Sequence, residues 1–146
     1  MIFMQALARA ESPAGQCLLL FEQGVIELLV SPRILSEIDD VLRRPILTRK
    51  FPALTDAVVD ALLENLIRNA MLVFDVPKQV TYQRDPKDEP YFDLALITNA
   101  RYLVSRDNDL LDLSSMESQR FRSLFPFLTI LDPVSLLNEI ELMMLE

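Results

Sequence analysis

Four short apolar runs, separated by segments with helical spacing of apolar residues, place the strongest limit on how this chain folds. The runs are VIELLV (25–30), MLVFDV (71–76), YLVS (102–105) and LTIL (128–131). Such runs, bounded by glycine, proline or polar residues, are typical of buried strands. Strands joined through helices need crossover connections, which favour a mainly parallel sheet. The pattern predicts one α/β domain over residues 1–146.

Capping residues indicate where the helices begin. Ser12 and Ser31 each precede a proline, and Thr55 precedes a run of apolar residues with helical spacing. A hydroxyl at the N-cap followed by proline at the first helical position is a typical helix start. We expect helices at about 13–22, 32–44, 46–50, 56–70, 89–100 and 133–144, a helical turn within 106–113 and a weaker helix at 116–124.

The absence of histidine restricts the chemistry open to this chain. It excludes Ser-His and Cys-His catalytic pairs and zinc sites that need imidazole. Cys17 is the one cysteine, so no disulfide forms within the chain, which suggests a reducing cytoplasm. The two glycines, Gly15 and Gly24, cannot form a P-loop or a dinucleotide fingerprint.

The many carboxylates of the chain are oxygen ligands, which hard cations such as Mg²⁺ or Mn²⁺ prefer. The chain has 22 acidic and 14 basic residues, for a net charge of −8. This balance argues against tight nonspecific binding to nucleic acid, but not against a metal-dependent nuclease. No apolar run approaches the roughly 20 residues of a membrane span, and no basic region precedes the apolar start, so we expect neither membrane insertion nor a signal peptide.

Acidic residues concentrate between 85 and 112. They are Asp85, Asp88, Glu89, Asp93, Asp107, Asp109 and Asp112. Asp88 and Glu89 begin a predicted helix, and Asp107 follows a predicted strand. Loops at the carboxyl ends of parallel strands gather at one edge of a sheet, where ligands bind. Converging carboxylates repel one another unless a cation such as Mg²⁺ or Mn²⁺ neutralises them, so the sequence predicts a metal site.

Simpler interpretations remain open for these acids. Asp88 and Glu89 also suit the positive end of a helix dipole, and Asp107 and Asp109 are ordinary turn residues. Glu37, in the helix after the first apolar run, points toward the same end of the sheet or pairs with a basic residue on the surface.

A basic segment follows that helix. Arg43, Arg44, Arg49 and Lys50 lie within eight positions of one another. They form a candidate surface for a nucleic acid backbone, or they neutralise the negative end of a helix.

Four segments together resemble the PIN domain family, and in particular its VapC-like branch, the toxin components of bacterial toxin–antitoxin pairs. The segments are SPAGQCLLLFEQGVIELLVSP (12–32), ILSEIDDVLRRPILTRKFP (34–52), RDPKDEPYFDLALITNARYLVSRDNDLL (84–111) and TILDPVSLL (129–137). The resemblance implies a three-layer α/β/α fold and a Mg²⁺- or Mn²⁺-dependent endoribonuclease that hydrolyses RNA phosphodiester bonds. It implies RNA as substrate and an antitoxin protein as partner.

The resemblance also assigns roles to individual residues. Glu37, Asp88 and Asp107 match the family's catalytic, metal-binding acids, and Glu89 and Asp109 match neighbouring positions that support the metal.

The resemblance also includes one position with a hydroxyl side chain, which we expect to contact the substrate. Ser105 stands where the family usually has threonine and retains the hydroxyl group. We therefore expect Ser105 to contact substrate, together with the basic segment already described.

One departure concerns the start of the chain. PIN domains begin with a central strand that ends in an aspartate, whereas MIFMQALARAES (1–12) resembles the stretch directly after it. The resemblance therefore implies that the first central strand and its aspartate are missing, and the activity is in doubt. Exposed sheet edges would then favour a homo-oligomer. The alternative is a catalytically impaired PIN-like module that binds RNA or a partner protein without cutting.

Overall fold

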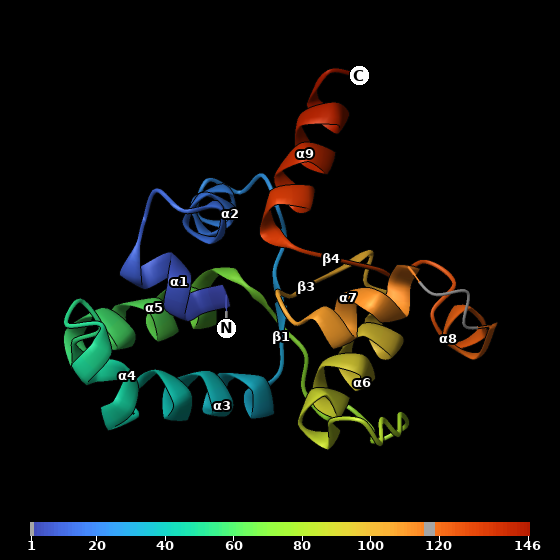
Figure 1. The fold of residues 1–146 in the computed structure, drawn as a ribbon, viewed down its shortest axis with the longest axis horizontal. Coiled ribbons are helices and arrows are strands. Elements are labelled where there is room, and N and C mark those ends of the chain that lie inside the picture. The colour runs from blue at the N-terminus through green and yellow to red at the C-terminus, as the bar shows by residue number, and fades with distance from the viewer. Residues whose placement is uncertain (1, 116–118) are drawn as a thin grey trace. The chain divides into compact units, whose positions relative to one another are not determined.

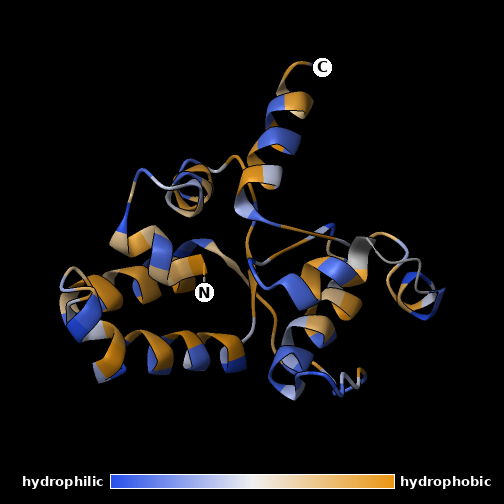
Figure 2. Cartoon of the chain, viewed as in Figure 1, coloured by the Kyte–Doolittle hydropathy of each residue, from blue (hydrophilic) through white to orange (hydrophobic). Residues whose placement is uncertain are grey.

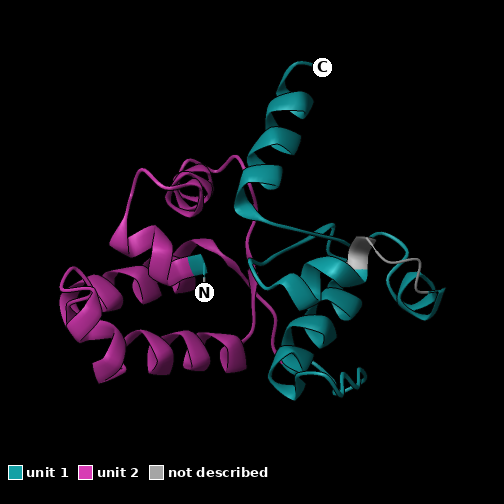
Figure 3. Ribbon diagram, in the orientation of Figure 1, with its two compact units in different colours: residues 1–2, 75–146 teal, residues 3–74 magenta. Residues whose placement is uncertain are grey.

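The computed structural model describes residues 2–115 and 119–146 of the chain (Figure 1). The chain divides into two compact units, residues 3–74 and residues 1–2 with 75–146 (Figure 3). Each unit holds its own pair of strands and its own buried apolar residues. The single domain expected over the whole chain stays a prediction.

The unit of residues 3–74 consists mainly of helices with one short pair of strands. The helices are α1 (Ile2–Ala8), α2 (Pro13–Glu22), α3 (Pro32–Leu42), α4 (Pro45–Lys50) and α5 (Asp56–Asn69). The strands are β1 (Leu29–Val30) and β2 (Met71–Leu72). They pair in parallel, as the sequence predicts, with Leu29 opposite Met71 and Val30 opposite Leu72.

Hydroxyl side chains begin three of these helices at the predicted positions. Ser12, Ser31 and Thr55 each accept a hydrogen bond from the backbone N–H three residues later, at 3.1, 3.2 and 3.2 Å. Each bond satisfies an N–H group that the first helical turn leaves without a partner inside the helix. The predicted starts of α2, α3 and α5 are therefore confirmed.

Both glycines of this unit are required by the backbone. A Cβ atom at Gly15 would lie 2.2 Å from the carbonyl oxygen of Ala10, so any larger residue would force the two segments apart. Gly24 follows α2 with a φ of +75°, a conformation that L-residues with a side chain rarely adopt. This position confirms the predicted end of α2.

Helices α3 and α5 pack against each other through apolar side chains. Along α3 the buried residues recur at every turn, and its ribbon carries both hydrophobic and hydrophilic residues (Figure 2). The buried residues of the pair are Ile34, Ile38, Leu42, Val59, Leu62 and Leu66. This spacing is that of an amphipathic helix with one face in the core.

Arg43, at the end of α3, joins the two helices at the surface. Its guanidinium contacts Asp39 at 2.6 Å, Asp56 at 2.9 Å, and Asp60. These three carboxylates, with Asp39 first, raise the pKa of Arg43 above its usual value. The positive charge of Arg43 is thus offset within its own unit.

The second unit contains the acid-rich segment. Its helices are the 3₁₀ helix η1 (Pro86–Asp88), α6 (Glu89–Thr98), α7 (Asn108–Ser115), α8 (Gln119–Leu124) and α9 (Pro133–Met144). Its strands, β3 (Tyr102–Val104) and β4 (Thr129–Leu131), pair in parallel with Leu103 opposite Ile130.

An aromatic cluster holds this second unit together. The ring of Phe92, on α6, lies 5.4 Å from the ring of Tyr82, 6.4 Å from that of Phe121 and 5.6 Å from that of Phe125. Edge-to-face and tilted contacts at these distances stabilise a core beyond the area they bury. The cluster fixes α6 against the segments on either side of the acidic loops.

The predicted strands are present but shorter than expected. Residues 25–28 and 73–76 lie outside β1 and β2, and the four strands form two separate two-stranded sheets. The predicted α/β fold with parallel strands is confirmed, since both pairs of strands are parallel. A strand extends only as far as its residues pair with a neighbouring strand, and each apolar run is longer than its paired part. Part of the 116–124 prediction, residues 116–118, lies outside the described residues.

Ahead of β1 the described residues form α1 and α2. The missing first strand that the resemblance implies stays a prediction. No helix within residues 2–115 and 119–146 is long and apolar enough to cross a membrane.

A buried carboxylate ties the loop before the acidic segment to α6. Asp93 is 5% exposed, and its Oδ1 accepts hydrogen bonds from the N–H groups of Gln79 at 2.9 Å and Val80 at 2.7 Å. Hydrogen bonds to a charged group are stronger than those between neutral groups. Asp93 therefore fixes the path of the chain just before the predicted site.

Replacing Asp93 by alanine should lower the free energy of unfolding by about 2–4 kcal/mol, because two N–H groups lose their acceptor. Asp93→Asn, which keeps an acceptor oxygen, should lose less. Urea denaturation followed by circular dichroism measures both. The control is Glu64→Ala, which removes an exposed ion pair with Arg68 and should cost under about 1 kcal/mol. Equal losses for Asp93→Ala and Glu64→Ala would contradict the anchoring role.

Candidate metal and nuclease site

Three carboxylates of the second unit converge at one point. Asp85, Asp88 and Asp107 each offer an oxygen, and these oxygens lie within 4.8 Å of one another. Asp85 and Asp88 are half-buried, and Asp107 is exposed. We call this set the carboxylate cluster. It joins the loop before α6 to the loop after β3.

The 3₁₀ helix η1 places two of the three carboxylates. Asp85 precedes η1 and its Oδ1 accepts the N–H of Lys87 at 3.1 Å, while its carbonyl accepts the N–H of Asp88 at 3.1 Å. Pro86 starts the turn without needing a partner for a backbone N–H. The N-cap and the last residue of this short helix thus lie close together, and oxygens of Asp85 and Asp88 are within 4.8 Å of each other.

The third carboxylate is placed by the end of the sheet. The N–H of Ser105 donates to the carbonyl of Leu131 at 3.0 Å, which extends the β3–β4 pairing by one residue. The hydroxyl of Ser105 then accepts the N–H of Asp107 at 3.0 Å, and Asp107 Oδ1 accepts the N–H of Asp109 at 2.8 Å. Ser105 thus orients the turn that carries Asp107. Contact between Ser105 and substrate stays a prediction.

Glu89 is the acid beside Asp88, and its carboxylate contacts the preceding loop. Its side chain is 12% exposed, and it accepts hydrogen bonds from Lys78 Nζ at 2.5 Å and from the N–H of Tyr82 at 2.7 Å. These bonds, like those of Asp93, hold residues 78–82 against α6. A role for Glu89 in metal binding stays a prediction.

Asp109, predicted to support the metal, lies opposite a basic residue. Its Oδ1 is 3.4 Å from Arg84 Nη2, and both side chains are more than half exposed. The buried hydroxyl group of Tyr82 interacts with both charges of this pair. Burial raises the pKa of Tyr82, and the positive charge of Arg84 opposes that rise.

Glu37 belongs to the other unit. It lies on α3, half-buried, in the helix predicted for it. Its place in the site with Asp88 and Asp107 stays a prediction.

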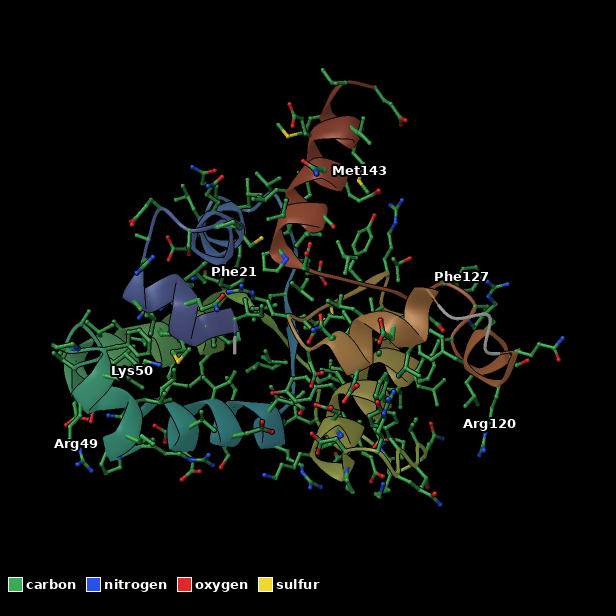
Figure 4. All side chains as sticks on the ribbon, in the orientation of Figure 1. Phe21, Arg49, Lys50, Arg120, Phe127 and Met143 are labelled. Carbon is green, nitrogen blue, oxygen red and sulfur yellow. The ribbon has the colours of Figure 1, made fainter. Side chains whose placement is uncertain are left out.

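The basic segment divides into two parts. Arg43 contacts three carboxylates, and Arg44 contacts Asp40 at 3.1 Å. Arg49 and Lys50 lie at the end of α4, where Lys50 is 5.6 Å from the ring of Phe51 (Figure 4). Basic residues in a last helical turn stabilise the negative end of the helix, which was one of the two interpretations of this segment. RNA contact by these residues stays a prediction.

The carboxylate cluster fits a divalent cation. Its donors are hard carboxylate oxygens, which Mg²⁺, Mn²⁺ and Ca²⁺ prefer. Two oxygens on opposite sides of Mg²⁺ are separated by about 4.2 Å, twice the Mg–O distance of about 2.1 Å. The separations in the cluster reach no further than 4.8 Å. The separations are therefore of the size that ligands of one such ion require.

The α/β fold and the carboxylate cluster together indicate a protein of a class that binds hard divalent cations. A model of the PIN domain family matches residues 1–109, which is most of the chain, so the chain belongs to the PIN domain family. Comparison with the curated proteins and with the solved structures found no match. The family resemblance is thus confirmed, and PIN domains are in general nucleases that use divalent metals.

Asp85 is the member of the cluster that was not assigned from the sequence. It was counted among the seven acids between 85 and 112 but given no role. The signal was present in the spacing D-P-x-D (85–88), because a proline after an N-cap aspartate predicts a turn that aligns both acids.

Removing one carboxylate should weaken Mn²⁺ binding by about tenfold or more, because affinity follows the number of charged ligands. Isothermal titration of Asp85→Asn, Asp88→Asn and Asp107→Asn measures this. Asparagine retains the capping role of Asp85 and Asp107, so folding is preserved. In EDTA each variant should be slightly more stable than the wild type, because repulsion inside the cluster is reduced.

The matched control for the metal titration is Asp40→Asn, an exposed acid on α3 that contacts Arg44. Its Mn²⁺ affinity should equal that of the wild type. If the control and the three cluster variants lose affinity alike, the metal is held by general surface charge and not by the cluster.

Proposed function

We propose that this protein is a metal-dependent endoribonuclease that hydrolyses RNA phosphodiester bonds with Mg²⁺ or Mn²⁺ at the carboxylate cluster. The observation that carries the proposal is the convergence of Asp85, Asp88 and Asp107 in a chain of the PIN domain family. Asp88 and Asp107 are catalytic, metal-binding residues in this proposal, Asp85 is added to them, and Glu89 and Asp109 support the site. The catalytic, metal-binding role of Glu37 stays a prediction.

The roles of the chain's own residues follow from their contacts. Asp85, Asp88 and Asp107 hold the cation, while Ser105 and the bonds within η1 keep the two loops in position. A bound divalent cation supplies activation of water as a nucleophile and stabilises negative charge on the phosphate. The chain has no histidine that could serve as general base, so the activation of water would depend on the metal.

Cleavage of a single-stranded RNA should require Mn²⁺ or Mg²⁺ and should fall by about two orders of magnitude or more in Asp85→Asn, Asp88→Asn or Asp107→Asn. The reason is that the metal's charge stabilisation is worth several kcal/mol. Gel analysis of an end-labelled RNA measures the rate. Asp40→Asn is the control and should cleave like the wild type.

Two outcomes would change the assignment. Equal cleavage by the wild type and all three cluster variants would identify a contaminating nuclease. Metal-dependent RNA binding by the wild type without any cleavage would favour the alternative, a PIN-like module that binds RNA or a partner protein without cutting.

We further propose that the protein acts in the cytoplasm as the toxin of a toxin–antitoxin pair, inhibited by its antitoxin. The support is the family branch that the sequence resembles and the acidity of the site. A basic segment of an antitoxin would complement the carboxylate cluster and the net charge of −8.

We also propose that the chain forms a homo-oligomer through its strand edges. Each of the four strands pairs along one edge only within the described residues. Unpaired edges offer N–H and C=O groups to another chain. Light scattering across a range of concentrations should show a mass above the 16.7 kDa of one chain. A constant 16.7 kDa species at the highest concentration would rule this assembly out.

A further inference from the structure

Basic residues are built into the two loops that carry the carboxylate cluster. Each acid of the cluster directly follows one in the sequence: Arg84 before Asp85, Lys87 before Asp88 and Arg106 before Asp107. All three basic side chains are exposed. The neighbourhood of the cluster therefore contains positive charge, although the chain as a whole is strongly negative.

Arg84 is the basic residue that reaches from one loop to the other. Arg84 adjoins Asp85, and its Nη2 lies 3.4 Å from Oδ1 of Asp109, two residues after Asp107. The hydroxyl group of Tyr82 interacts electrostatically with Arg84, and the ring of Tyr82 packs against Phe92. The guanidinium of Arg84 is thus held at the rim of the cluster, where a ligand of the cation would meet it.

We propose that Arg84 binds a backbone phosphate of the RNA substrate beside the carboxylate cluster, which deepens the proposed function and rests on it. The guanidinium presents a planar set of donors that matches two oxygens of a phosphate. In the absence of substrate, Asp109 takes the place of the phosphate. The binding of RNA exchanges one carboxylate partner for one phosphate partner.

Replacing Asp109 by a phosphate as the partner of Arg84 costs little free energy. The side chains of Arg84 and Asp109 are 55% and 57% exposed, and surface ion pairs of this kind are worth about 0–1 kcal/mol. By contrast, Arg43 contacts three carboxylates, and Lys78 contacts a nearly buried one on Glu89. Arg84 can leave its partner more easily than either of these.

Binding of a fluorescent single-stranded RNA, followed by anisotropy with Ca²⁺ in place of Mn²⁺, tests the proposal apart from cleavage. Arg84→Gln should weaken binding by about fivefold or more at low salt. Between about 50 and 200 mM KCl, the slope of log Kd against log salt should fall by about 0.7, the value for one phosphate contact on a single strand. Arg84→Lys should retain the slope, because it keeps the charge.

The matched control is Arg120→Gln, an exposed arginine on α8 of the same unit that points away from its helix (Figure 4). It should bind RNA with the affinity and slope of the wild type. Equal slopes for Arg84→Gln and the wild type, or an equal loss in Arg120→Gln, would overturn the role of Arg84 and leave the proposed nuclease untouched. If the wild type neither binds nor cleaves RNA with any divalent cation, both the proposed function and this inference fail.

Discussion

Repulsion among three carboxylates is the constraint on which the candidate site depends. Two unit charges 4.8 Å apart repel by about 1 kcal/mol in water and by about 3.5 kcal/mol at an effective dielectric constant of 20. The loops withstand this repulsion because short-range backbone bonds set each acid in place. Asp85 and Asp107 each accept an N–H two residues later, at 3.1 and 2.8 Å. Local hydrogen bonds thus hold the carboxylates close together, and a bound cation would neutralise their negative charge.

Two other acids near the cluster, Glu89 and Asp93, bind protein groups of the loop that precedes η1. Asp93 receives two backbone N–H groups, and Glu89 receives one N–H and the ammonium of Lys78. Both hold residues 78–82 on α6 and so support the loop that leads into η1. In the other unit, Arg43 likewise binds Asp39, Asp56 and Asp60 at the end of α3.

The sequence predicted the helices more accurately than the strands or the site. Helix starts are encoded locally, so Ser12, Ser31 and Thr55 mark α2, α3 and α5 without further information. Strand limits depend on partners distant in sequence, and the run at 25–30 pairs only at Leu29 and Val30. The cluster was partly predicted, since Asp88 and Asp107 were named and Asp85 was not. Spacing alone does not tell which acids a partner already occupies, as the contacts of Glu89 illustrate.

Charge balance favours a basic residue beside a site of this kind. Three carboxylates with one divalent cation leave one negative charge, and a phosphodiester brings another. The chain as a whole, with a net charge of −8, gives no attraction for RNA at long range. The missing positive charge has to come from within the two loops or from a second cation. Arg84 can supply it because its present partner, Asp109, is exposed and weakly bound. Positive charge within the loops would therefore allow an acidic protein to bind an acidic polymer at one place.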